Sequence, residues 1–281
     1  MKIAISAETT IDITPELKER FNINIVPFSI QLGEVSGLDG EITTDQIISY
    51  VNEKKVLPKT SAVNEFQYLE HFGNLKKDYD AVIHFSLSSE LSLACTNAKR
   101  AASQFENVFV IDTLSLSTGI ALLAFYAKDL VDQGVEVNEI VRLCNERVPY
   151  VQASFELKRL DYLYKGGRCS GLTFFGANLL KIRPQIIVKD GKMIPGKKYR
   201  GNFNHVVRKY CQDVLEEFDK PDLTRVFITY TTADKEIIDS TIELLQDRGF
   251  KEIFVTRAGG TITSHCGEDC LGVLYINDYK N

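Results

Sequence analysis

Three serine hydroxyls stand close together in the segment Ala81–Ala102 and carry the most concentrated side-chain chemistry of this sequence. Ser88, Ser89 and Ser92 follow the apolar run Ala81–Phe85 and precede apolar residues at helical spacing, an order that predicts strand, loop and helix. Hydroxyls at the carboxyl end of a strand lie beside the free N–H groups of the next helix. Such a loop can bind a ligand that carries oxygen, most simply an anion; alternatively, the serines only cap the helix.

His265 is the second group with chemistry, and it stands in the Gly- and Thr-rich segment Ala258–Gly267, which we predict as a loop. An imidazole there can donate to a carboxylate or act as a base, whereas the alternative is a solvated histidine. Cys266 and Cys270 lie nearby, but three such residues on one short loop do not have the spacing of a zinc site. The sequence also has no GxxxxGKS/T or GxGxxG motif, so it predicts neither a metal nor a cofactor.

Ser92 and His265 could instead be the nucleophile and base of an acyl-ester hydrolase. Such enzymes often place the serine in a GxSxG elbow, and no serine of this sequence has those neighbours. We therefore interpret the hydroxyls as ligand-binding groups and keep the hydrolase as the alternative.

Basic residues gather in one segment of an otherwise acidic chain. Arg168 follows a glycine pair and three further cations, and Arg200 follows Lys197-Lys198-Tyr199. These positions favour a phosphate-binding or docking surface, with a solvated helix face as the alternative.

Composition limits the classes of protein to be considered. The chain has 281 residues, of which 44% are hydrophobic, so its length favours two domains. A net charge of −5 argues against nucleic acid as the main partner. Six cysteines without a CxxC pair predict reduced thiols. We see neither a signal peptide nor an apolar stretch that could span a membrane, and we expect a cytoplasmic protein.

Strands alternate with helices in residues 1–150, which predicts an N-terminal three-layer α/β/α domain with a mostly parallel sheet. The predicted strands are Lys2–Ser6, Ile23–Leu32, Ala81–Phe85 and Val108–Asp112, with helices after Thr14, Thr43, Asn64, Ser92, Ser117 and Asn138 and a loop at Pro58–Ser61. Ligands of such sheets bind beyond the carboxyl ends of the strands. We therefore expect a site where the turns Glu8–Thr9, Ser88–Ser92 and Asp112–Thr113 converge.

Residues 151–281 predict a C-terminal two-layer α+β domain with a mixed or antiparallel sheet and helices on one face. The predicted elements are the strand Val151–Leu157, the helix Leu172–Leu180, the hairpin Ile186–Met193, the helix His205–Phe218, the strand Arg225–Tyr230, the helix Lys235–Arg248 and the strands Ile253–Arg257 and Leu271–Ile276. The hairpin is predicted from Asp190-Gly191, a pair that favours a tight turn between strands.

Several of these segments stand in an order typical of one protein family. They are Pro58-Lys59-Thr60-Ser61, Ser88-Ser89-Glu90-Leu91-Ser92, the turn from Asp112 to Gly119, the segment from Leu160 to Ser170 with Gly166-Gly167-Arg168, Lys181-Ile182-Arg183-Pro184, and His265 before Gly267. Over nearly its whole length the sequence resembles the DegV family of bacterial fatty-acid-binding proteins.

The resemblance implies two domains that hold one long-chain fatty acid in an apolar tunnel between them. It also implies that Thr60, Ser92 and His265 hydrogen-bond the carboxylate, with Ser61 and Ser89 close by. Hydroxyls and an imidazole suit this task because they hold a carboxylate without burying a lone charge.

The resemblance further implies a protein partner, a separate ATP-dependent fatty-acid kinase that phosphorylates the presented acyl group. Arg168 and Arg200 would then contact the kinase or the phosphate of the acyl phosphate. The chain itself would be a lipid-binding protein without enzyme activity or cofactor, in at most transient contact with membranes. A lipid-responsive regulator is a further alternative.

Four positions depart from the family pattern as the resemblance gives it. They are Glu8-Thr9 for Asp-Ser, Ala62-Val63 for Gln-Pro, Leu93-Ala94 for Gly-Thr, and Gly267-Glu268-Asp269 for Gly-Pro-Gly. Because Leu93 adds a side chain at a helix start, we expect the carboxylate end of the tunnel to be reshaped.

Overall fold

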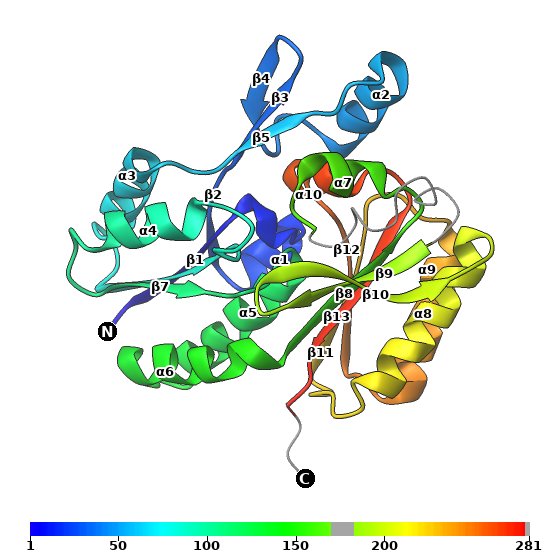
Figure 1. Ribbon diagram of the computed structural model, residues 1–281. Coiled ribbons are helices and arrows are strands. Elements are labelled where there is room, and N and C mark those ends of the chain that lie inside the picture. Colours follow the sequence, from blue (N-terminus) through cyan, green and yellow to red (C-terminus); the bar gives the residue numbers. More distant parts are fainter. Residues whose placement is uncertain (170–182, 279–281) are drawn as a thin grey trace.

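The computed structural model describes residues 1–169 and 183–278, and its first half is built on a four-stranded parallel sheet. The strand order is β2-β1-β6-β7, with β1 at Ile3–Glu8, β2 at Ile23–Val26, β6 at Ala81–Ser86 and β7 at Val108–Asp112. Helices α3 (Glu65–Leu75) and α4 (Ala94–Ala102) cover one face, and α5 (Thr118–Asp132) covers the other (Figure 1). Further helices are α1 (Pro15–Arg20), α2 (Thr44–Lys54) and α6 (Val137–Arg147). The predicted α/β/α arrangement is confirmed.

Short-range sequence signals begin three of these helices where we predicted them. Thr14 caps α1, with its side chain accepting from a backbone N–H of the first turn. Thr43 and Gln46 form a reciprocal capping box at α2, and Asn64 and Gln67 do the same at α3.

Helix α5 is buried along most of its length because it lies between two sheets. It contacts β1 and β6 of the parallel sheet, and also β8 (Val151–Leu157), β11 (Arg225–Tyr230) and β13 (Cys270–Ile276) of the second sheet. Every residue from Thr118 to Phe125 is buried. This position explains why the sequence of α5 is apolar on all sides rather than along one stripe.

The second sheet has six strands in the order β10-β9-β8-β13-β11-β12. Only β11 and β12 (Glu252–Arg257) pair in parallel in the described part of this sheet, which gives the predicted mixed sheet. Helices α8 (Phe203–Glu217) and α9 (Lys235–Arg248) cover the face turned away from α5 (Figure 1). The division of the chain into domains 1–150 and 151–281 stays a prediction.

The predicted hairpin forms from β9 (Arg183–Lys189) and β10 (Lys192–Tyr199). Its turn residues Asp190 and Gly191 have φ of 49° and 78°, the left-handed values that a tight hairpin turn requires. The helix predicted at Leu172–Leu180 lies outside the described residues.

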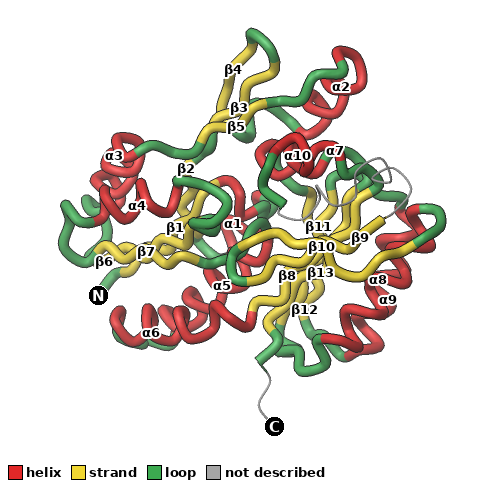
Figure 2. Tube along the Cα trace, in the orientation of Figure 1, coloured by secondary structure: helices red, strands yellow, loops and turns green. Residues whose placement is uncertain are grey.

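A small antiparallel sheet, β4-β3-β5, stands beside α2 at one end of the molecule (Figure 2). Its strands are β3 (Ser29–Leu32), β4 (Val35–Leu38) and β5 (Lys59–Ser61). The sequence predictions for this region were wrong in two respects. The single strand Ile23–Leu32 divides at Pro27, which has no N–H for a ladder, so β2 and β3 join different sheets. The predicted loop Pro58–Ser61 contains β5, in which Thr60 pairs with Ile30.

The loop predicted at Ala258–Gly267 is also wrong, because its central residues form helix α10 (Gly260–Cys266). Propensity alone disfavours a helix with this many glycines and threonines. Contacts with distant residues stabilise it, as described below.

Candidate functional site

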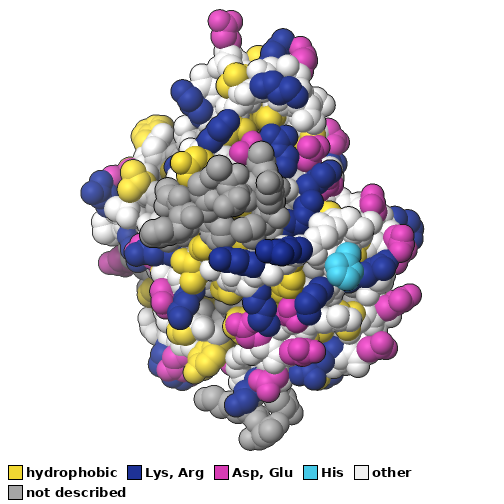
Figure 3. Space-filling model, turned by 45° about the vertical axis from the view of Figure 1, so that its right-hand side comes forward, with side chains coloured by type: hydrophobic (Ala, Val, Ile, Leu, Met, Phe, Trp, Pro, Cys, Tyr) yellow, Lys and Arg dark blue, Asp and Glu magenta, His cyan; other side chains and the backbone are white. Residues whose placement is uncertain are grey.

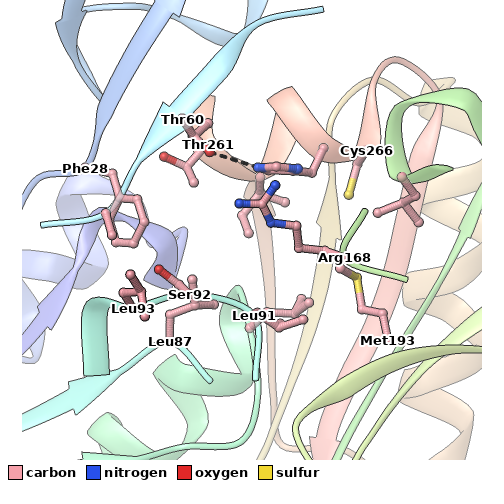
Figure 4. Close-up of a pocket in the computed structure, with 15 residues that line it drawn as sticks. Phe28, Thr60, Leu87, Leu91, Ser92, Leu93, Arg168, Met193, Thr261 and Cys266 are labelled. Atoms are coloured by element: carbon pink, nitrogen blue, oxygen red, sulfur yellow. Dashed lines mark hydrogen bonds between the residues drawn. The ribbon is translucent and has the colours of Figure 1, made fainter. Parts of the chain in front are cut away.

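A cavity of about 230 Å³ opens where the parallel sheet, the small sheet and α10 meet. Most of its wall is apolar, and five of its described lining residues are polar or charged; Thr60 and Thr261 lie on one side of the view and Ser92 on the other (Figure 4). The apolar lining residues are Phe28, Ala62, Leu87, Leu91, Leu93, Leu116, Leu163, Met193, Ile262 and Cys266, and the others are Thr60, Ser92, Arg168, Thr261 and His265.

Thr60 and His265 form the polar centre of this cavity. Thr60 Oγ1 lies 2.9 Å from His265 Nε2, so β5 of the small sheet is hydrogen-bonded to the last turn of α10. The other side of the imidazole packs on Gly166 at the end of α7 (Asp161–Gly166). A Cβ at that glycine would stand 2.9 Å from His265 Nδ1, so glycine leaves the room that the ring needs.

The imidazole of His265 is uncharged at neutral pH. Burial lowers its pKa from 6.5 to about 4, and the nearby positive charge of Arg168 contributes in the same direction. A neutral ring has one N–H donor and one acceptor nitrogen, so Nε2 can either accept from the Thr60 hydroxyl or donate to an oxygen atom bound beside it.

Ser92 lines the cavity and also bonds the start of the following helix. Its Oγ accepts a hydrogen bond from the N–H of Ala94 at 3.2 Å, although the N-cap position of α4 is Leu93. Accepting that bond leaves the O–H hydrogen available to a ligand oxygen. This local bond and ligand binding are therefore compatible at the serine.

Three of the predicted site residues lie outside the cavity wall. Ser61, Ser89 and Arg200 are exposed and do not line it. Ser89 uses its N–H to bond the carboxylate of Asp112 at 3.2 Å. Ser88, the remaining hydroxyl of the loop, is buried and donates to the carbonyl of Gly191 at 2.8 Å, which ties the loop to the β9–β10 turn.

Of the three strand-end turns, Glu8–Thr9 and Asp112–Thr113 do not line the cavity, whereas Ser92 of the turn Ser88–Ser92 does. Glu8 is fully buried, with Tyr68, Ser86 and His84 hydrogen-bonded to its Oε1 at 2.6, 2.6 and 3.0 Å. Its Oε2 accepts from the N–H of Leu87 at 3.0 Å. Burial alone raises the pKa of Glu8, but His84 and these hydrogen bonds outweigh burial and bring it below the ordinary value. Of this network only Leu87 reaches the cavity.

A second, apolar cavity of about 20 Å³ lies next to the first one, against the second sheet. Leu116, Ile262 and Cys266 line both cavities and form the wall that the two share, which we call the neck. Beyond the neck lie Phe155 and Leu274 together with other residues of the second sheet. The cavity that contains the polar groups and the apolar cavity thus adjoin.

The outer rim beside Thr60 and His265 is basic. Lys55, Lys59, Lys165 and Arg168 line it, and none of the described residues that line it is acidic. Lys and Arg side chains gather on the upper part of the face shown in Figure 3. The sequence analysis missed Lys55 and Lys59, because only the tertiary structure brings the α2–β5 connection next to Arg168.

The departure Glu268-Asp269 is explained by two ion pairs. Lys158 contacts Asp269 at 2.5 Å, and Arg159 contacts Glu268 at 3.8 Å. These two basic residues of the predicted docking segment are therefore used within the protein, whereas Lys165 and Arg168 face the rim.

The hydrolase alternative requires a hydrogen bond between nucleophile and base. Here His265 Nε2 bonds Thr60, and Ser92 accepts from a backbone N–H. Within residues 1–169 and 183–278, no group of His, Cys, Asp and Glu side chains could hold a metal ion. In the same ranges, no helix is long and apolar enough to cross a membrane.

Comparison with known proteins gives full-length matches. The family model described as "Uncharacterised protein, DegV family" matches residues 2–278. A fatty acid-binding protein of Thermotoga maritima is 28% identical, over 97% of this chain and 96% of that protein. The structure of DegV from Bacillus subtilis, titled a fatty acid binding protein, has a TM-score of 0.85 at 26% identity and covers 99% of this chain and 100% of that one. A Thermus thermophilus structure with a TM-score of 0.90, 24% identity and coverage of 99% and 100% shares the fold.

Proposed function

Because the chain belongs to the DegV family, as the sequence resemblance predicted, we propose that it binds one long-chain fatty acid. The carboxylate lies at Thr60, Ser92 and His265, and the acyl chain runs through the neck into the second, apolar cavity between the predicted domains. One observation carries this proposal: Thr60, Ser92 and His265 line one cavity whose wall is otherwise mostly apolar, with Arg168 as its single charged residue among those described.

The residue types support a division of roles within the site. Burying an acyl chain of about sixteen carbons contributes on the order of 10 kcal/mol before the costs of binding, at roughly 0.8 kcal/mol per methylene. The hydroxyls and the imidazole contribute less and orient the head group. Arg168 adds a positive charge at the rim without being buried beside the carboxylate.

Mass spectrometry of the purified protein tests this function directly. Under native conditions we expect a mass excess that equals one fatty acid, and denaturing conditions should release it. A protein that carries no such mass and takes up no added fatty acid contradicts the proposal. The ligand search would then turn to other small acids that fit the mouth reshaped by Leu93, whose side chain is 71% exposed at the cavity.

The proposal extends to a partner, a separate ATP-dependent fatty-acid kinase that meets the basic rim in the cytoplasm. Replacing Arg168 with alanine should slow formation of acyl phosphate by roughly tenfold, because rim charges guide association with an acidic partner surface. Fatty-acid binding should fall by much less. Arg142→Ala is the matched control, since Arg142 pairs with Glu139 and Glu146 on α6. Equal rates for both variants would remove Arg168 from the docking surface, and Arg200→Ala tests the second predicted contact.

A substitution in the neck is expected to change which acyl-chain lengths the protein binds tightly. Ile262→Phe adds bulk where the two cavities join, so the terminal methylenes of a long chain lose their place. Losing about two buried methylenes should weaken binding of a sixteen-carbon acid roughly tenfold and leave a ten-carbon acid unaffected. Titration with acids of graded length measures this, with Ile238→Phe on α9 as the control. An unchanged length profile would contradict the path through the neck.

A further inference from the structure

Two buried acidic side chains outside the cavity, those of Asp39 and Asp12, hold the first turn of α10. Asp39 follows β4 and is 7% exposed. Its Oδ1 accepts from the N–H of Gly260 at 2.8 Å, and its Oδ2 accepts from the N–H of Thr261 at 3.0 Å. Asp12 accepts from the N–H of Gly259 at 2.7 Å and from Ser117 Oγ at 2.5 Å. Together they satisfy the free N–H groups of this helix start.

The glycines at this position make room for Asp39 and its neighbours rather than for a ligand. A Cβ at Gly260 would stand 2.4 Å from Cδ1 of Ile30 in β3 and 3.0 Å from Asp39 Oδ1. The backbone of α10 can therefore approach the small sheet closely enough for both carboxylate bonds.

Asp39 and Thr60 attach the same small sheet to the two ends of α10. Asp39 follows β4 and holds the first turn, whereas Thr60 of β5 bonds His265 in the last turn. Because α10 has only seven residues, a rotation or shift at its start moves the imidazole at its end by a similar amount. The hydrogen bonds of the Asp39 carboxylate thus determine the orientation of the His265 side chain, although Asp39 does not bond to it.

We propose that Asp39 is a positioning residue for the head-group site, one that orients His265 toward Thr60 and the ligand carboxylate. This inference rests on the proposed function, since it names the part of the chain on which head-group recognition depends. Asp39 has no role in holding the acyl chain, which contacts other walls of the cavity.

Asp39→Asn tests the inference because it keeps the side-chain shape and removes one acceptor. An asparagine must turn its NH₂ toward one of the two backbone N–H groups, so one bond is lost. We expect the affinity for a sixteen-carbon fatty acid to fall about tenfold, while affinity for the primary alcohol of the same length stays unchanged. Asp45→Asn is the matched control, since Asp45 lies exposed on α2 and pairs only with Arg257 among the contacts described. It should change neither affinity.

Equal losses for acid and alcohol, or no loss for either, would overturn the positioning role. If Asp39→Asn fails to fold, Thr44→Val replaces it, because Thr44 Oγ1 donates to the carbonyl of Ala258 at 2.7 Å and supports the same helix start. The same selective loss is expected there. If the unaltered protein does not bind fatty acid, the proposed function fails. NMR of the imidazole ¹⁵N signals of His265 then tests the positioning role separately, because these signals should shift in Asp39→Asn and stay unchanged in Asp45→Asn.

Discussion

Replacing His265 with alanine is expected to lower the affinity for a long-chain fatty acid by roughly 10- to 100-fold, the usual effect of losing a hydrogen bond to a charged group. The imidazole is neutral and its Nε2 lies at Thr60 in the cavity wall, so a carboxylate bound there can take a hydrogen bond from Nε2–H in place of Thr60. Ser92→Ala should act in the same direction, because its hydroxyl lines the same mouth.

Calorimetric or fluorescence titration of protein stripped of lipid measures this effect. His205→Ala is the control, since His205 is exposed at the start of α8 and does not line the cavity. Both variants should keep the circular dichroism spectrum of the unaltered protein. Normal binding by both His265→Ala and Ser92→Ala would refute the assigned carboxylate site.

As pH rises, the free energy of unfolding of Asp12→Asn should increase relative to that of the unaltered protein. Burial raises the pKa of Asp12 from 3.8 to about 8, and the charge of Asp39 adds to this rise. Between pH 4 and pH 8 the folded chain keeps a proton that the unfolded chain has lost. The free energy of unfolding therefore falls as pH rises, by about 1.4 kcal/mol per pH unit from this group. Asparagine does not ionise, and it can still accept from Gly259 and donate to Ser117.

Urea denaturation at pH 5 and pH 7 gives the comparison. The stability of Asp12→Asn relative to the unaltered protein should increase by about 3 kcal/mol between these two values. The other ionisable groups contribute to both proteins and cancel in the difference. A relative stability that is the same at both pH values would mean that Asp12 is ionised in the folded chain.

Features that depend on neighbours in sequence were predictable. Helix starts at Thr43 and Asn64 are set by residues three positions away, and the Asp190-Gly191 turn is set by two residues. The parallel pairing of the first sheet followed from the alternation of strands and helices. Thr60, Ser92 and His265 share a cavity, as the family resemblance implied.

Features that depend on distant contacts were not predictable. Helix α10 exists in a glycine- and threonine-rich segment because Asp39 binds its first turn across 221 positions of sequence. No local pattern marks that contact. For the same reason, no local pattern indicated that Lys55 and Lys59 lie at the rim. Ser61 was predicted at the site, but the alternation of side chains along β5 turns it outward.

The position of helix α5 between the two sheets affects how the protein unfolds. One continuous core includes apolar residues of the parallel sheet, of α5 and of the second sheet, among them Ile5, Phe125, Phe155, Phe227 and Leu274. Since α5 packs on both sheets, neither half can unfold without exposing apolar residues of the other half to water. A fragment that ends at residue 150 would expose the face of α5 that meets β8, β11 and β13. The two halves therefore form one cooperative unit, despite their different architectures.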